Sequence, residues 1–126
     1  MLTGLVVLVV EDNVVNQKVA AGLLKRLGAT VELAANGVEA VAKCREKEYD
    51  VVLMDCHMPE MDGYAATMEI RKMDGAVRHL PIVALTAHAV MGYRERCLEV
   101  GCTGYLAKPV RKRELLEGVA AALLGV

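Results

Sequence analysis

The sequence predicts an α/β protein: a doubly wound, five-stranded parallel sheet in the strand order 2-1-3-4-5, with five helices on its two faces. Two observations support this fold class. Short apolar runs that end in turn residues, such as residues 51–54, are typical of strands buried on both faces of a parallel sheet. These runs alternate strictly with helical patterns, and right-handed crossovers with short loops then leave few topologies.

The first strand is predicted from an apolar run, and the first helix from a stripe of apolar residues. Residues 5–10 are all apolar, and either Asp12 or Asn13 after them is suited to cap a helix. The helix should end at Gly28. Its inward stripe is predicted from apolar residues at a spacing of four, namely Val15, Val19, Leu23 and Leu27.

The middle of the chain repeats this pattern with a second strand, a second helix and a third strand. Residues 30–34 form a short strand, and after the Asn36-Gly37 turn a helix is expected over 38–47. Its inward residues are predicted to be Val38, Val41 and Ala42. The third strand, residues 50–54, runs directly into Asp55.

The last three helices and two strands follow in the same alternation. A helix over 63–73 is broken by Asp74-Gly75, and a fourth helix over 91–100 ends at Gly101. The strands between and after them are residues 81–86 and 103–107. A final helix spans 111–124, with an apolar stripe of Leu115, Leu116, Val119 and Leu123.

Composition predicts one domain over residues 1–126 that binds neither nucleic acid nor membrane through bulk charge. The 15 basic and 16 acidic side chains nearly cancel, and no apolar run reaches the length of a membrane span. The start of the chain lacks the basic region of a signal peptide, so a cytoplasmic location is the default expectation. The cysteines have no paired spacing and are interpreted as buried or partly buried thiols: Cys44, Cys56, Cys97 and Cys102.

Polar residues follow four of the predicted strands at one edge of the sheet. Glu11 and Asp12 follow the first strand, Asp55 the third, Thr86 ends the fourth and Lys108 follows the fifth. Because parallel strands end at the same edge, three carboxylates should share one cleft with a hydroxyl and an ammonium group. Like charges about 4 Å apart repel by roughly 1 kcal/mol in water and about 4 kcal/mol at an effective dielectric of 20.

This charge imbalance predicts a metal site with phosphoryl chemistry. Oxygen-only ligands favour a hard cation, and two or three carboxylates with water suit Mg²⁺. Lys108 can bind a phosphate or pair with Asp55. A carboxylate in such surroundings is equipped to accept a phosphoryl group, since that transfer needs mainly positioning and charge neutralisation.

With these residues in place, the chain resembles a receiver domain of two-component signalling over nearly its whole length. The matching motifs, in the order and spacing of that family, are Val9-Val10-Glu11-Asp12-Asn13, Leu53-Met54-Asp55, Met58-Pro59-Glu60-Met61-Asp62-Gly63, Ala84-Leu85-Thr86-Ala87 and Leu106-Ala107-Lys108-Pro109. Asn13 with Asn16-Gln17, and the run 85–89, look most like receivers of hybrid histidine kinases.

The resemblance implies a role for each site residue. Asp55 would accept a phosphoryl group from the phosphohistidine of a histidine kinase or histidine phosphotransfer protein, within a phosphorelay. Glu11, Asp12, Asp55 and the backbone carbonyl of His57 would hold Mg²⁺, and Lys108 would bind a phosphoryl oxygen.

The resemblance also implies a switch and a backbone geometry. Thr86 would move toward the phosphate and Tyr105 would swing inward with it, which changes the face formed by the fourth helix, fifth strand and fifth helix. The Lys108-Pro109 bond is usually cis in this family. A receiver catalyses only its own phosphorylation and dephosphorylation, so it is not an enzyme with a separate substrate. A monomer or weak dimer is expected.

Other interpretations fit the residues less well. Phosphatases with a carboxylate nucleophile place a second aspartate two residues later, where this chain has His57. An interaction module without chemistry would not need the complete set of site residues. A flavin-binding protein would need a Ser/Thr-rich phosphate loop after the first strand. His57 and His88 share no two-histidine spacing that would predict a transition metal, but His57 flanks the acceptor and can tune the attack of water.

Overall fold

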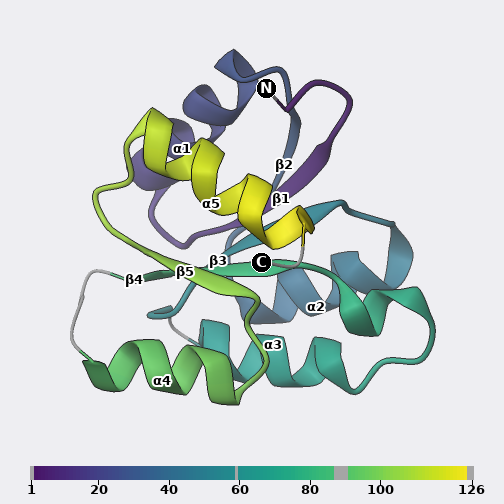
Figure 1. The fold of residues 1–126 in the computed structure, drawn as a ribbon. Helices are drawn as coiled ribbons and strands as arrows, with labels where there is room; N and C mark the ends of the chain where they lie inside the picture. Colours follow the sequence, from purple (N-terminus) through teal and green to yellow (C-terminus); the bar gives the residue numbers. More distant parts are fainter. Residues whose placement is uncertain (1, 59, 87–90, 125–126) are drawn as a thin grey trace.

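The computed structural model describes residues 2–58, 60–86 and 91–124, and it confirms the predicted fold class. A parallel five-stranded sheet has the order β2-β1-β3-β4-β5, so the strand order reverses between β1 and β3 (Figure 1). Two stretches of the family motifs, Pro59 and residues 87–89, lie outside the described residues.

The elements agree with the predicted ones to within two residues at their ends. The strands are β1 (Val6–Val10), β2 (Thr30–Ala34), β3 (Val51–Asp55), β4 (Ile82–Thr86) and β5 (Gly104–Ala107). The helices are α1 (Val14–Arg26), α2 (Gly37–Glu46), α3 (Gly63–Arg71), α4 (Met91–Glu99) and α5 (Lys112–Leu124). A short 3-10 helix, η1 (Ala76–His79), was not predicted, because the segment after Asp74-Gly75 carries no periodic apolar pattern.

Two hydrophobic cores lie on opposite faces of the sheet. Helices α1 and α5 cover one face, and α2, α3 and α4 cover the other (Figure 1). Strand residues alternate between the cores, as the pleat requires. Val7, Val9 and Leu53 pack under α1 and α5, whereas Leu8, Val10 and Met54 pack under the other three helices.

This alternation also directs the residues at the end of β3. Leu53 faces the α1 and α5 side, Met54 faces the other side, and Asp55 therefore returns to the first side. Cys56, the next residue, packs into the core beneath α2, α3 and α4. Adjacent residues of the chain thus enter opposite layers of the molecule.

The predicted inward face of α1 is wrong in its first half. Val15 and Val19 are 67% and 54% exposed, whereas Leu24 and Leu27 are buried. A spacing of four advances about 40° around a helix at each step, so a stripe defined that way drifts away from the sheet.

The predicted inward faces of α2 and α5 are right only in part. In α2, Val41 is buried, but Val38 and Ala42 are exposed, and Ala40 and Cys44 contact the sheet instead. Small residues at a helical spacing let this helix pack closely, a signal that apolar bulk does not reveal. In α5, Leu115 and Val119 are buried as predicted and Leu116 is half-buried, whereas Leu123 is 38% exposed and Ala122 takes its place in the core.

All four cysteines are buried free thiols, as predicted. Burial raises the pKa of Cys44 to about 11 and that of Cys102 to about 12. A thiol with a raised pKa stays protonated at neutral pH and is a poor nucleophile and metal ligand. These cysteines therefore act as core residues.

None of the helices in the described part of the chain is long and apolar enough to cross a bilayer.

Candidate functional site

The carboxyl ends of four strands bring the predicted site residues to one edge of the sheet. Asp55 and Thr86 are the last residues of β3 and β4, while Glu11 and Lys108 directly follow β1 and β5. The register pairs Val10 with Met54, Asp55 with Leu85, and Thr86 with Ala107, so these strands end at the same level.

Three carboxylates converge at this edge. One oxygen from each of Glu11, Asp12 and Asp55 lies within 4.8 Å of the others. Glu11 and Asp55 are only 2% and 3% exposed, whereas Asp12 is exposed to solvent. Buried carboxylates need a counter-charge, because removing them from water disfavours the ionised form. The donor set is all oxygen, which fits a hard divalent cation.

Lys108 supplies a counter-charge from within the chain. Its Nζ lies 2.7 Å from Glu11 Oε2 and 3.2 Å from Asp55 Oδ2. Burial lowers the pKa of this ammonium group, but the hydrogen bond to Glu11 and the negative charge of Asp55 outweigh burial and raise the pKa above its usual value. The lysine therefore stays charged at neutral pH. The Lys108-Pro109 peptide bond is cis, as the family resemblance implied.

The start of α1 holds Glu11 in place. The Asn13 side chain caps the helix by accepting a hydrogen bond from the Asn16 backbone N–H at 3.1 Å. The Gln17 side-chain amide donates to the Glu11 carbonyl oxygen at 2.6 Å, and the Asn16 side-chain amide lies 3.5 Å from Glu11 Oε1. The capping was predicted from sequence, but the contacts of Asn16 and Gln17 with Glu11 depend on how the chain turns after β1.

The loop after Asp55 is fixed by close backbone packing. The His57 backbone N–H donates to Asp55 Oδ1 at 3.1 Å, which orients the carboxylate. The Gly63 N–H donates to the Cys56 carbonyl at 3.3 Å, and the Gly37 N–H donates to the Met61 carbonyl at 3.1 Å. The loop is therefore tied to the first residues of both α2 and α3.

Gly63→Ala is expected to destabilise the protein by about 2–3 kcal/mol, the upper range for overpacking a tight contact. A Cβ at Gly63 would lie 2.2 Å from the Asp55 carbonyl oxygen, so the backbone itself must shift. Gly22→Ala is the matched control, because nothing lies within 4 Å of a Cβ there. It should stabilise α1 by about 0.5–1 kcal/mol. Urea titration measures the free energy of unfolding of both variants. Equal changes in the two variants would contradict the close-packing explanation.

Thr86 and Tyr105 lie on the same side of the sheet. Thr86 is fully buried, and Tyr105 is half-buried against the core beneath α2, α3 and α4. Tyr105 pairs with Ala84, two residues before Thr86 on β4. Because every second residue shares a face, the hydroxyl-bearing strand end and the aromatic ring are neighbours across adjacent strands.

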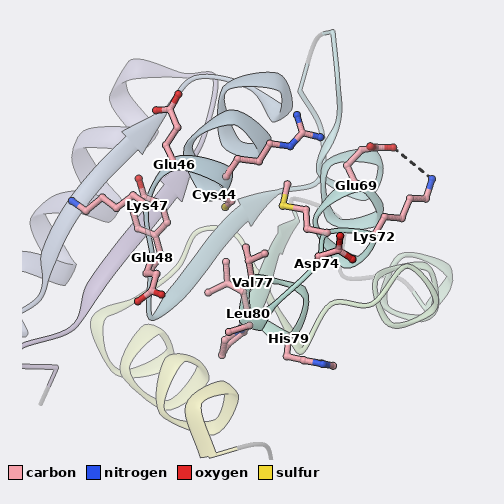
Figure 2. A pocket seen from close by; sticks show the side chains of 15 residues that line it. Cys44, Glu46, Lys47, Glu48, Glu69, Lys72, Asp74, Val77, His79 and Leu80 are labelled. Carbon is pink, nitrogen blue, oxygen red and sulfur yellow. Dashed lines mark ion pairs between the residues drawn. The ribbon is translucent and has the colours of Figure 1, made fainter.

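A cavity on the described surface adjoins the site. This cavity of about 400 Å³ lies between α1 and α5. Glu11 and Lys108 line it, and its apolar lining includes Val19, Leu23 and Val110. A larger cleft of about 770 Å³ lies at the opposite edge of the sheet, beside the ends of α2 and α3. Its charged residues include the Glu69–Lys72 ion pair (Figure 2), and none of the predicted site residues lines it.

This site and fold define a class of protein, and comparison with known proteins confirms it. Residues 7–120 match the model of the response regulator receiver domain, and the chain belongs to that family. It is 38% identical to probable histidine kinase 4 of Oryza sativa subsp. japonica over 94% of this chain. It is 43% identical to hybrid signal transduction histidine kinase G of Dictyostelium discoideum over 86% of this chain. The chain spans 14% and 3% of the lengths of these two kinases.

Solved structures give the same family at full domain length. The chain is 45% identical to the receiver domain of a sensor histidine kinase from Pseudomonas aeruginosa, with a TM-score of 0.89. The match covers 96% of this chain and 98% of that one, and that structure holds a magnesium ion coordinated in its active-site cleft. A chemotaxis response regulator of Vibrio cholerae is 32% identical, with a TM-score of 0.88 and coverage of 96% and 100%.

Proposed function

We propose that Asp55 is the phosphoacceptor of this receiver and that Glu11, Asp12 and Lys108 neutralise the charge of the transferred group. The convergence of three carboxylate oxygens within 4.8 Å beside the Lys108 ammonium group carries this proposal. Asp55, and not Glu11, is the last residue of β3. One of its carboxylate oxygens accepts a hydrogen bond from the His57 backbone N–H. The proposal also follows the family membership, because receiver domains accept phosphoryl groups in two-component signalling.

The transfer requires one bond to form and one to break. A carboxylate oxygen of Asp55 attacks the phosphorus of a phosphohistidine, the P–N bond breaks, and the electron pair returns to the imidazole ring, which takes a proton. The product is an acyl phosphate on Asp55. Lys108 moves from its carboxylate partners to a phosphoryl oxygen, which offsets part of the added negative charge.

Magnesium is the proposed cofactor. Glu11, Asp12, Asp55 and the His57 backbone carbonyl would hold it, and their oxygen-only set suits this ion. When bound, Mg²⁺ neutralises charge on the phosphoryl oxygens and the acidic cluster.

Intact mass after treatment with acetyl phosphate tests this function. The protein should gain one phosphoryl group with Mg²⁺ and none with excess chelator. Partial hydrolysis of the adduct on standing would report the self-catalysed dephosphorylation, and a His57→Asn variant would show whether His57 tunes that rate. A folded protein that gains no group with Mg²⁺ would contradict the proposed function.

The face of α1 beside the site is the proposed docking surface for the phosphohistidine donor. Val14, Val15 and Val19 are 54–67% exposed on this helix, and Val19 also lines the cavity that Glu11 and Lys108 line. An apolar surface this close to a charged site suits a partner that must bring its own histidine to Asp55. A histidine phosphotransfer protein is the proposed donor.

Val15→Asp should slow phosphoryl transfer from a histidine phosphotransfer protein by about 10-fold or more, the effect of losing roughly 1.4 kcal/mol at an interface. Phosphorylation by acetyl phosphate should be unchanged, because a small donor needs no docking surface. Leu124→Asp is the control, because Leu124 is also apolar and exposed but lies in α5. Equal slowing with both donors would mean that Val15→Asp damages the site and not docking.

The output proposed for the acyl phosphate is a change in the face formed by α4, β5 and α5. A phosphate that hydrogen-bonds Thr86 in only one conformer favours that conformer, and Tyr105 moves into the space that Thr86 leaves. The adjacency of these two residues across β4 and β5 supports this switch.

A further inference from the structure

The two residues after Asp55 connect the acceptor to α4 by a route that does not include Thr86. Cys56 follows the acceptor directly, and its Sγ lies 3.6 Å from Cys97 Sγ on α4. Both thiols are buried, at 1% and 0% exposure. The end of β3 therefore packs against the middle of α4 on the side of the sheet away from the acceptor carboxylate.

Tyr64 makes a second contact between the same two parts of the chain. Its ring lies at the start of α3, edge-on to the His57 ring at a centroid distance of 6.3 Å. The Arg96 guanidinium group of α4 lies 4.7 Å from the Tyr64 ring centroid, in a cation–π contact. One aromatic ring thus touches the acceptor loop and α4.

The Tyr64 hydroxyl group is an unusual feature of this contact. The side chain is 5% exposed, and among the described residues the hydroxyl oxygen has no hydrogen-bond partner. Burial and the nearby Cys56 thiol raise the Tyr64 pKa. Packing in the core and the Arg96 contact hold the ring in place.

We propose that Tyr64 is a coupling residue, which links the acceptor loop to the position of α4 through Arg96, in parallel with Thr86 and Tyr105. This inference rests on the proposed function. The Arg96 contact belongs to the conformer in which Lys108 binds Glu11 and Asp55. A contact that is made in this conformer and weakened in the conformer where Lys108 binds a phosphoryl oxygen favours the first conformer over the second. By linkage, loss of the contact strengthens phosphoryl binding at a site that Arg96 does not touch.

The test is titration of the protein with beryllium fluoride, a phosphoryl mimic, in saturating Mg²⁺, with heat of binding as the signal. Arg96→Met should raise the affinity by about two- to five-fold, the range expected of a partly exposed cation–π contact. Tyr64→Leu should raise it similarly. Tyr64→Phe, which keeps the ring, should leave it unchanged, and so should Glu95→Gln, an exposed neighbour on α4.

The outcomes separate this inference from the function on which it rests. If the wild-type protein binds beryllium fluoride and Arg96→Met binds it with the same affinity, the coupling role is wrong and the acceptor chemistry stands. If the wild-type protein binds no beryllium fluoride and gains no phosphoryl group, both fail. Arg96 is exposed, so its variant should fold; circular dichroism checks this. Tyr64→Phe matching Tyr64→Leu would also overturn the role of the ring.

Discussion

Asp55→Asn is expected to abolish the phosphoryl adduct that acetyl phosphate gives with Mg²⁺. An amide oxygen carries no negative charge and cannot form the acyl phosphate, so intact mass should show only the unmodified protein.

The control for this substitution is Asp50→Asn. Asp50 lies at the other end of β3, where its Oδ2 accepts a hydrogen bond from the Val6 N–H at 2.7 Å. This variant should be phosphorylated normally. An adduct that persists in Asp55→Asn would assign the acceptor to another carboxylate, and peptide mapping would then decide between Glu11 and Asp12.

Lys108→Met is expected to lower the free energy of unfolding by about 2–3 kcal/mol without Mg²⁺. Removing one partner of a fully buried ion pair typically costs about 3–5 kcal/mol. The expected loss is smaller here because the Lys108 side chain is 22% exposed. Glu11 and Asp55 would be left without their nearest positive charge. Saturating Mg²⁺ should restore most of the loss, because the cation then neutralises both carboxylates.

Urea titration with Mg²⁺ and with chelator measures this difference. A loss of the same size under both conditions would show that Lys108 acts through packing and not through charge. The raised pKa of Lys108 also sets a pH window. Its stabilisation should be complete below about pH 10.4, the pKa of free lysine, and be lost as the pH rises through the higher folded-state value. The Lys108→Met variant should not show this loss of stability at alkaline pH.

The strand order and the edge that holds the site were predictable because they depend on local patterns. Apolar runs such as residues 51–54 fix where strands end, and topology then brings those ends together. Side-chain orientation was less predictable. Val15 and Val19 looked like core residues because sequence shows only that a side chain is apolar. The spacing of apolar residues does not show whether they pack against the same chain or against a partner.

Contacts between distant segments were beyond prediction for a different reason. The Lys108–Glu11 distance of 2.7 Å and the Arg96–Tyr64 distance of 4.7 Å each join segments that only the finished fold brings together. The sequence predicted that Lys108 can pair with Asp55, and the 3.2 Å distance confirms it, but the closer contact with Glu11 was not predicted. Cys56 alternates away from the site along β3, but its contact with Cys97 depends on the position of α4.

Asp55 and Cys56 point to opposite sides of the sheet, and this affects which surfaces stay accessible when a partner protein is bound. The proposed donor surface on α1 lies on one side of the sheet, and α4 lies on the other (Figure 1). A donor bound over α1 leaves the α4 side open. The α4 part of the proposed output face therefore stays accessible to a second protein while a donor is bound, whereas α5 lies on the same side of the sheet as the donor.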